Sequence, residues 1–137
     1  MTGSPSLEIA RTTTIPSHMV IVEYLNKVQS CEREKMKSDL LELRSELFKN
    51  HIILPLDFQP YGKKLYSERF NHDISYLNSA GVIEEKSGSI IYQITKRGKE
   101  MQKERSRCYE NIPHDVIDTF DSILLKFIGA GNKVKNA

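Results

Sequence analysis

A length of 137 residues is that of one domain, and 39% apolar residues are enough for a compact core. The formal net charge of +2 does not by itself identify a nucleic-acid-binding protein. No run approaches the roughly 18 apolar residues of a membrane span, and two distant cysteines without a CxxC motif indicate reduced thiols in a cytoplasmic protein.

Residues 1–18 are expected to lie outside the folded domain. They lack helical or strand periodicity and are rich in Thr, Ser and Pro, so they form either a flexible arm or a leader that ends before Met19. The sequence then predicts a single domain over 19–129 and a tail over 130–137. Ser17 is the expected cap of a first helix. The apolar face of that helix comprises Val20, Ile21, Tyr24, Leu25 and Val28.

Two further segments lead to the middle of the chain. Residues 31–50 form the longest helical pattern, with one apolar stripe and charged residues elsewhere. Residues 52–58 are a short apolar run, and because Pro55 has no N–H to donate, we expect an edge strand or an extended linker there. A turn signal follows at residues 59–62.

Residues 66–101 carry the strongest pattern of the chain. Apolar residues three and four positions apart predict a helix over 67–80, and Gly81 stands where a helix C-cap is favoured. Two short β-rich runs, 82–86 and 90–94, are joined by a Ser-Gly-Ser turn and predict a hairpin. The inward-facing residues of the helix are then Phe70, Ile74 and Leu77.

The order of these elements predicts the fold class. Residues 99–105 return to helical spacing, so that helix, glycine, strand, turn, strand and helix follow one another, as in a winged helix-turn-helix. We therefore predict an α+β, mainly α, fold with a small antiparallel β-hairpin as its wing, and part of 52–58 is a candidate further strand. A long C-terminal helix is expected over 112–128. Its expected start and end signals are Asn111, Pro113 and Gly129.

Two motifs in this region carry a family resemblance. The first motif is Leu77-xxx-Gly81-Val82-Ile83 followed by Tyr92-Gln93-Ile94-Thr95-xx-Gly98. It resembles the core of MarR- and PadR-type winged-helix proteins. The second motif is Phe58-Gln59-Pro60-Tyr61-Gly62. It resembles a turn that leads into the corresponding helix in the antitoxin-associated Panacea domain family. The first resemblance implies a winged-helix fold, and the second implies toxin neutralisation or adaptor work.

Catalysis is not expected, because the sequence shows no converging set of nucleophile, acid–base or metal-binding groups. The four histidines are scattered and lack HxH or HExxH spacing, and no glycine-rich phosphate loop opens a helix. The pair His114-Asp115 is typical of a polar first helical turn. The sequence therefore predicts no enzyme activity, no metal and no cofactor.

The expected contact surface is the outer face of the 67–80 helix together with the wing. Arg and Asn side chains can read base edges, Ser and His offer adaptable hydrogen bonds, and Tyr can contact phosphate or sugar. Glu68 and Asp73 would repel phosphates if they faced a duplex. Candidate contact residues on the helix are Ser67, Arg69, Asn71, His72, Ser75, Tyr76 and Ser79. Candidates for contact with the nucleic-acid backbone are Lys63, Lys64, Lys86, Ser87 and Ser89.

The favoured function is transcription regulation through binding of double-stranded DNA. The basic excess falls near the wing, because residues 84–107 contain seven Lys or Arg and four Glu. The alternative is a protein-interaction module, antitoxin- or adaptor-like, built on the same scaffold. A homodimer is expected through an apolar stripe on the C-terminal helix. That stripe comprises Val116, Phe120, Ile123 and Phe127.

Overall fold

The computed structural model describes residues 12–86, 90–104 and 109–136, with the side chains of 130–136 excepted. Within these residues the fold is α+β, with five helices and three small sheets. The helices are α2 (Ser17–Val28), α3 (Arg33–Phe48), α4 (Glu68–Ser79), α5 (Lys96–Lys103) and α6 (His114–Asn136). The strands are β1 (Thr13–Thr14), β2 (Ser30–Glu32), β3 (Ile52–Ile53), β4 (Gln59–Tyr61), β5 (Lys64–Tyr66), β6 (Ile83–Glu85) and β7 (Ile91–Ile94).

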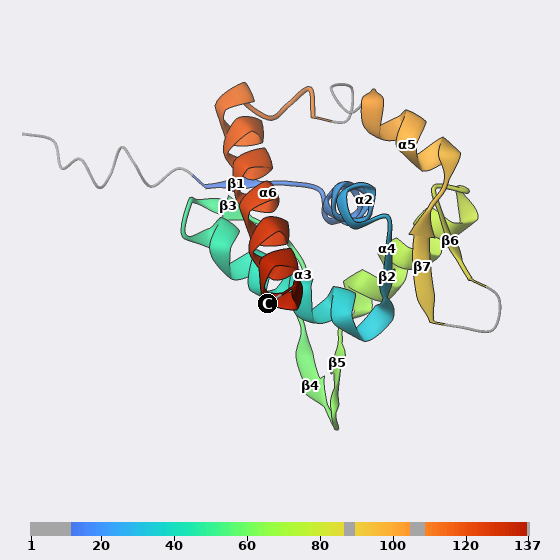
Figure 1. Cartoon of the computed structure of the whole chain (residues 1–137). Helices are drawn as coiled ribbons and strands as arrows, with labels where there is room; N and C mark the ends of the chain where they lie inside the picture. Colours follow the sequence, from blue (N-terminus) through green and yellow to red (C-terminus); the bar gives the residue numbers. More distant parts are fainter. Residues whose placement is uncertain (1–11, 87–89, 105–108, 137) are drawn as a thin grey trace, which may run out of the picture.

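The centre of the fold is α2, which is seen end-on in the middle of Figure 1 with the other helices around it. All seven residues from Met19 to Leu25 are at most 1% exposed. A helix buried on all sides is the usual outcome when its apolar residues are not confined to one stripe. The expectation of a single apolar face was therefore too narrow.

The predicted hairpin is confirmed as β6 and β7, which pair antiparallel with Ile83 opposite Ile94. The third strand of this sheet is β2, which pairs with β7 and places Cys31 opposite Tyr92. Part of residues 52–58 does form a strand, as predicted, but it does not join this sheet. The segment Ile52–Ile53 instead pairs in parallel with β1 in a separate sheet.

The N-terminal boundary of the domain also differs from the prediction. The backbone N–H of Thr13 donates to the carbonyl of His51 at 3.0 Å, and the N–H of Ile15 donates to the carbonyl of Ile53 at 3.0 Å. The Ile15 side chain is buried in the core. Residues 13–18 therefore belong to the folded domain and are not an arm that ends before Met19. The prediction for residues 1–11 concerns residues that the structure does not describe.

The turn signal at residues 59–62 proves to be part of a second hairpin, made by β4 and β5. Its two-residue loop is Gly62–Lys63, since Tyr61 pairs with Lys64 across the strands. Gly62 has a φ of +63°, whereas Lys63 is not among the positive-φ residues, and this combination fits a type II′ turn. The hairpin projects from the body of the molecule between α3 and α4 (Figure 1).

The helix predicted over 67–80 is confirmed as α4, and its end signals work as expected. The Ser67 side chain accepts a hydrogen bond from the Phe70 N–H as the N-cap. Gly81 has a φ of +75°, which a residue without Cβ adopts with little strain. After the β6–β7 hairpin, the Thr95 hydroxyl accepts from the Gly98 N–H and caps α5.

The C-terminal helix differs from the prediction at both ends. It begins at His114, because the Pro113 carbonyl accepts from the N–H groups of Val116 and Ile117, and Asn111 lies outside it. It also continues through Gly129 to Asn136, so the predicted end at 128 and tail at 130–137 are wrong. A glycine inside a helix costs only about 1 kcal/mol relative to alanine, so it does not have to end one.

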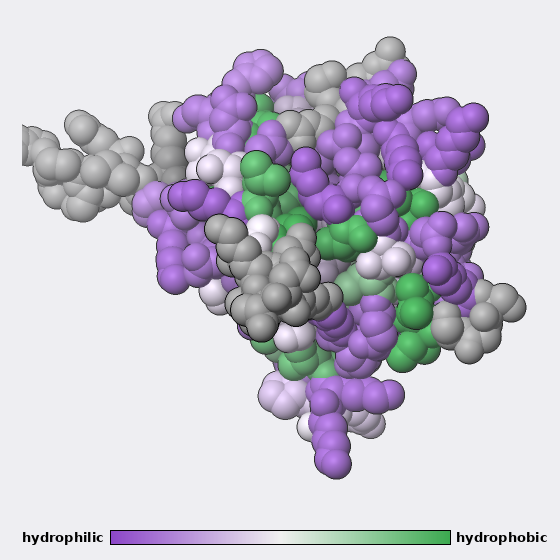
Figure 2. All heavy atoms as spheres, viewed as in Figure 1, coloured by the Kyte–Doolittle hydropathy of each residue, from purple (hydrophilic) through white to green (hydrophobic). Residues whose placement is uncertain are grey.

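The surface of the described fold is mostly hydrophilic on the face shown in Figure 2, with hydrophobic patches in its middle beside α6. Among the described residues, none of the helices combines the length and apolar character needed to cross a bilayer.

Two glycines offer a matched test of this packing. A Cβ on Gly98 would lie 2.3 Å from the Val82 carbonyl oxygen, whereas a Cβ on Gly129 would meet nothing within 4 Å. We expect Gly98→Ala to lower the free energy of unfolding by about 1–3 kcal/mol through overpacking. Gly129→Ala should raise it by about 0.5–1 kcal/mol, because alanine favours helix. Urea unfolding of the two variants measures both, and equal effects would contradict the packing described.

Candidate nucleic-acid interface

The inward face of α4 is as the sequence predicts. Phe70, Ile74 and Leu77 are buried in the core, and the opposite face is open to solvent. The exposed residues of that face are Arg69, His72, Ser75, Tyr76, Asn78 and Ser79. Tyr76 also makes an edge-on contact with the ring of His18, at 5.7 Å between centroids. The helix therefore presents a guanidinium, an imidazole, a phenol, hydroxyls and an amide to a partner.

One of the two acids expected near this face turns away from it. Asp73 is 3% exposed, and its carboxyl group accepts a hydrogen bond from the Ser17 hydroxyl of α2. A buried carboxyl group with such a partner contributes to the core and not to the outer face. Glu68 remains exposed at the first turn of α4. Of the two α4 carboxylates that were predicted to repel phosphates, only that of Glu68 therefore faces solvent.

Two predicted contact residues of α4 are used within the fold. Ser67 is a correction, because its side chain is 2% exposed and serves as the helix cap. The Asn71 amide oxygen accepts from the Arg33 guanidinium at 2.7 Å. Arg33 also donates to the Tyr92 hydroxyl at 3.3 Å, so it links the start of α3 to α4 and β7. Burial raises the pKa of Tyr92, which keeps its phenol neutral as an acceptor.

Sequence reasoning missed Arg33, because it was placed inside a long helical pattern over 31–50. In the structure α3 begins only at Arg33, after the short strand Ser30–Glu32, and the Glu32 carboxylate accepts from the N–H groups of Lys35 and Glu34. The sequence carries no clear signal for this start, because glutamate is not a favoured N-cap residue and a basic residue at the first helical position opposes the helix dipole.

The basic candidates lie on two separate hairpins. Lys63 and Lys64 are exposed at the tip of the β4–β5 hairpin, which was expected to be only a turn before α4. Lys86 is exposed just after β6, and its N–H donates to the Ile91 carbonyl at 2.9 Å. Ser87 and Ser89 lie outside the described residues.

The base of the β4–β5 hairpin and the start of α4 share one recess of about 750 Å³. Gln59 and Tyr66 contribute from the hairpin, and Arg69 and His72 contribute from the outer face of α4. The carboxylates of Asp57 and Glu68 also line the recess. The exposed face of the hairpin therefore continues directly into the exposed face of the helix. We call this combined surface the hairpin–α4 surface, defined by Gln59, Tyr61, Lys64, Tyr66, Arg69 and His72.

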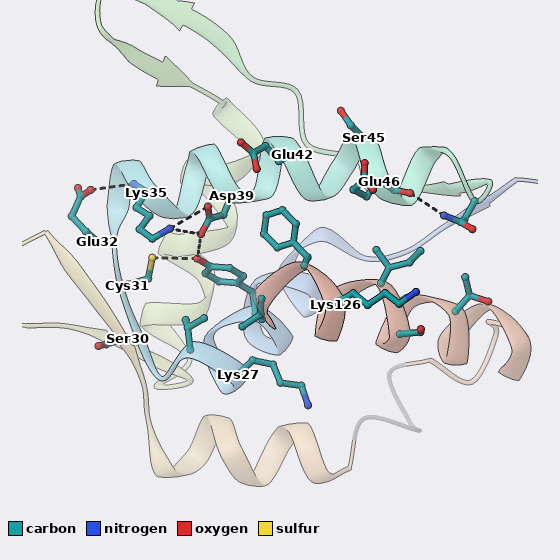
Figure 3. Close-up of a pocket in the computed structure, with 18 of the residues that line it drawn as sticks. Lys27, Ser30, Cys31, Glu32, Lys35, Asp39, Glu42, Ser45, Glu46 and Lys126 are labelled. Atoms are coloured by element: carbon teal, nitrogen blue, oxygen red, sulfur yellow. Dashed lines mark hydrogen bonds and ion pairs between the residues drawn. The ribbon is translucent and has the colours of Figure 1, made fainter. Parts of the chain in front are cut away.

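A second hollow lies elsewhere, between α3 and α6, with an open volume of about 1510 Å³ (Figure 3). Asp39 and Glu42 face it from α3, and Lys126 faces it from α6. The buried Tyr24 hydroxyl donates to Asp39 and lies 3.4 Å from the Cys31 sulfur. Burial, followed by the hydrogen bond to Asp39, raises the pKa of Tyr24, so its phenol remains protonated. This groove contains none of the predicted contact residues of α4 or the wing.

The predicted dimer stripe is partly used inside the chain. Phe120 is 0% exposed and belongs to the core, so its assignment to a subunit interface is wrong. Val116, Ile123 and Phe127 are half-buried and pack against the same core. The physical reason is the breadth of the apolar stripe of α6, of which the middle covers α2 and α3. Leu125 is the largely exposed apolar side chain of this helix.

The residues singled out for metal chemistry do not gather into one site in the described part of the chain. No set of three or more His, Cys, Asp or Glu lies close enough to hold a metal ion among those residues. His114 and Asp115 are exposed in the first turn of α6. Cys31 is buried, with its sulfur 3.4 Å from the Tyr24 hydroxyl, and Cys108 lies outside the described residues.

Comparison with known protein families, curated proteins and solved structures found no match for this chain.

The contact between Ser17 and Asp73 should control how firmly α4 is held. Replacing Ser17 by alanine leaves a buried carboxyl group without this donor, so we expect Ser17→Ala to lower the free energy of unfolding by about 1–3 kcal/mol. Ser75→Ala, an exposed serine of α4, is the matched control and should change it by less than about 0.5 kcal/mol. Chemical denaturation measures both. Equal small effects would mean that the contact does not hold α4 in place.

Proposed function

We propose that this protein binds double-stranded DNA as a winged-helix transcription regulator. The observation that carries the proposal is the order α2, β2, α3, α4, β6, β7, with the strands β3, β4 and β5 inserted between α3 and α4. The β2-β7-β6 sheet completes this arrangement, in which α4 buries one face and exposes the other. An exposed helix of this kind fits the major groove, which admits an α-helix. The resemblance to MarR- and PadR-type proteins supports the same proposal.

The chemistry of the exposed α4 face suits base and backbone contacts. Arg69 can donate two hydrogen bonds to guanine, and His72, Ser75 and Ser79 can donate to base edges or phosphates. Tyr76 can reach a phosphate or sugar, and Lys86 is a candidate for backbone contact from the wing. The inward position of Asp73 supports the proposal, because it removes one negative charge from this face.

A protein-interaction module remains the second candidate function. It is favoured by the aromatic character of the β4–β5 hairpin, where Tyr61 is 77% exposed and Tyr66 is 47% exposed. Exposed tyrosines are typical of protein interfaces. The exposed carboxylates of Glu68, Glu84 and Glu85 also suit a basic protein partner. The resemblance of residues 58–62 to the Panacea turn points in the same direction.

A homodimer would place two α4 helices against successive major grooves if they lay about 34 Å apart. With Phe120 in the core, such an interface would have to use Leu125 and the half-buried parts of Ile123 and Phe127. DNA binding by one α4 face does not require the dimer.

Arg69 provides the direct test of base recognition. We expect Arg69→Ala to weaken binding to a selected duplex by about 1–3 kcal/mol and to relax the preference at one base pair. Arg69→Lys is the matched control, because it keeps the charge but loses the planar fork, so binding to random duplex should be retained while the base preference is lost. Fluorescence anisotropy with both duplexes measures this. A wild-type protein without affinity for duplex DNA at low salt would favour the protein-interaction module.

Lys86 tests the contribution of the wing. Because each phosphate contact releases counterions, Lys86→Ala should lower the slope of log affinity against log salt concentration by about 0.9, alike for all sequences. Lys126→Ala removes an exposed lysine of α6 and should leave the slope unchanged. A salt titration on random duplex measures both, and equal slopes in wild type and Lys86→Ala would remove Lys86 from the interface.

A further inference from the structure

The β4–β5 hairpin has two unlike faces. Residues on alternate positions of paired strands share a face, so Gln59, Tyr61, Lys64 and Tyr66 lie together on one side, and Pro60 and Leu65 on the other. The rings of Tyr61 and Tyr66 are 6.3 Å apart between centroids, which agrees with a shared face. This face is exposed and continues into the recess beside Arg69 and His72.

The hairpin is also held firmly at its base. Lys37 of α3 is buried, and its ammonium group donates to the Leu65 carbonyl at 2.8 Å and to the Glu34 carboxylate at 3.1 Å. Just before β4, the Phe58 ring lies 6.0 Å from the ring of Phe70 in α4. Because a buried ammonium group is costly without hydrogen-bond partners, Lys37 must keep its bond to the Leu65 carbonyl. This bond fixes the hairpin to α3. The hairpin therefore keeps a set orientation relative to α4.

Charge distinguishes this hairpin from the predicted wing. Residues 59–66 contain two lysines and no acidic residue. Residues 83–91, which include the β6–β7 turn, contain Lys86 but also Glu84 and Glu85. The exposed carboxylates of those two residues oppose contact with phosphates, whereas Lys63 and Lys64 favour it. At the base of the first hairpin, Asp57 and Glu68 are exposed, and Asp57 is paired with Arg44 at 3.4 Å, so the basic charge is concentrated at the hairpin tip. Of the two hairpins that flank α4 in sequence, the first therefore has the tip that better matches a polyanion.

We propose that the β4–β5 hairpin is a second DNA-binding element, and that Lys63 and Lys64, not the β6–β7 wing, make the main backbone contacts beside α4. The inference rests on the proposed DNA-binding function. Tyr61, on the same face as Lys64, donates its hydroxyl to a phosphate or sugar in this arrangement. The hairpin and α4 then form one continuous surface across a groove and its flanking phosphates.

The test is a salt titration of binding to random-sequence duplex DNA by the full chain. Lys63→Ala/Lys64→Ala removes two phosphate contacts and should lower the slope of log affinity against log salt concentration by about 1.8, twice the change expected for Lys86→Ala. Lys63→Arg/Lys64→Arg should restore the wild-type slope, because it keeps the charges. The control Lys27→Ala/Lys126→Ala removes two exposed lysines that line the groove between α3 and α6 and should leave the slope unchanged.

Each outcome decides the matter. A slope that falls in the Lys63→Ala/Lys64→Ala variant, and not in the Lys27→Ala/Lys126→Ala control, supports the hairpin as a DNA-binding element. An unchanged slope in that variant, while Arg69→Ala still weakens binding, overturns the hairpin proposal and leaves the proposed function standing. A fall of the same size in the Lys27→Ala/Lys126→Ala control means that net charge alone is measured, which also overturns it. A wild-type protein that does not bind duplex DNA at low salt overturns both proposals.

Discussion

The burial of α2 on every side is the constraint on which the rest of the fold depends. The helices α4, α5 and α6 and the strands β2 and β7 all pack against it. Its polar side chains then need partners, and each finds one on a different element. Ser17 donates to Asp73 of α4, Tyr24 donates to Asp39 of α3, and Glu23 accepts from Gln102 of α5 at 2.5 Å. Because unpaired buried polar groups are costly, these contacts fix how the outer helices sit around α2.

This arrangement explains why α4 presents one face to solvent. Its inward side carries the apolar residues Phe70 and Leu77 and also Asp73, whose carboxyl group is drawn toward α2 by Ser17. What remains outside is a polar face with a guanidinium and several hydroxyl groups. The β4–β5 hairpin extends that face, because Lys37 and the contact between Phe58 and Phe70 hold its base against α3 and α4. The rigid core thus determines which side chains can meet a partner, as preorganised binding requires.

The elements that could be predicted were those with strong local signals. The α4 helix, its Gly81 end and the β6–β7 hairpin follow from a change of period and a positive-φ glycine. The strand β2 could not be predicted, since three residues beside a helical run carry no period and become a strand only by pairing with β7. The complete burial of Phe120 could not be predicted either. It depends on which side of the broad apolar stripe of α6 packs against α2, and only tertiary packing determines that side. Sequence reasoning located the exposed α4 face but not the hairpin–α4 surface, because the hairpin is held by Lys37, far away in the chain.

We propose that duplex DNA binds at the hairpin–α4 surface. An amide-resolved NMR titration of the protein with a random-sequence duplex tests it most directly, because it maps contacts without any substitution. We expect the largest amide chemical-shift changes in residues 59–79 and smaller changes near Lys86, with no change in α6. Chemical-shift changes confined to the groove between α3 and α6, or no changes at low salt, would contradict DNA binding at the hairpin–α4 surface.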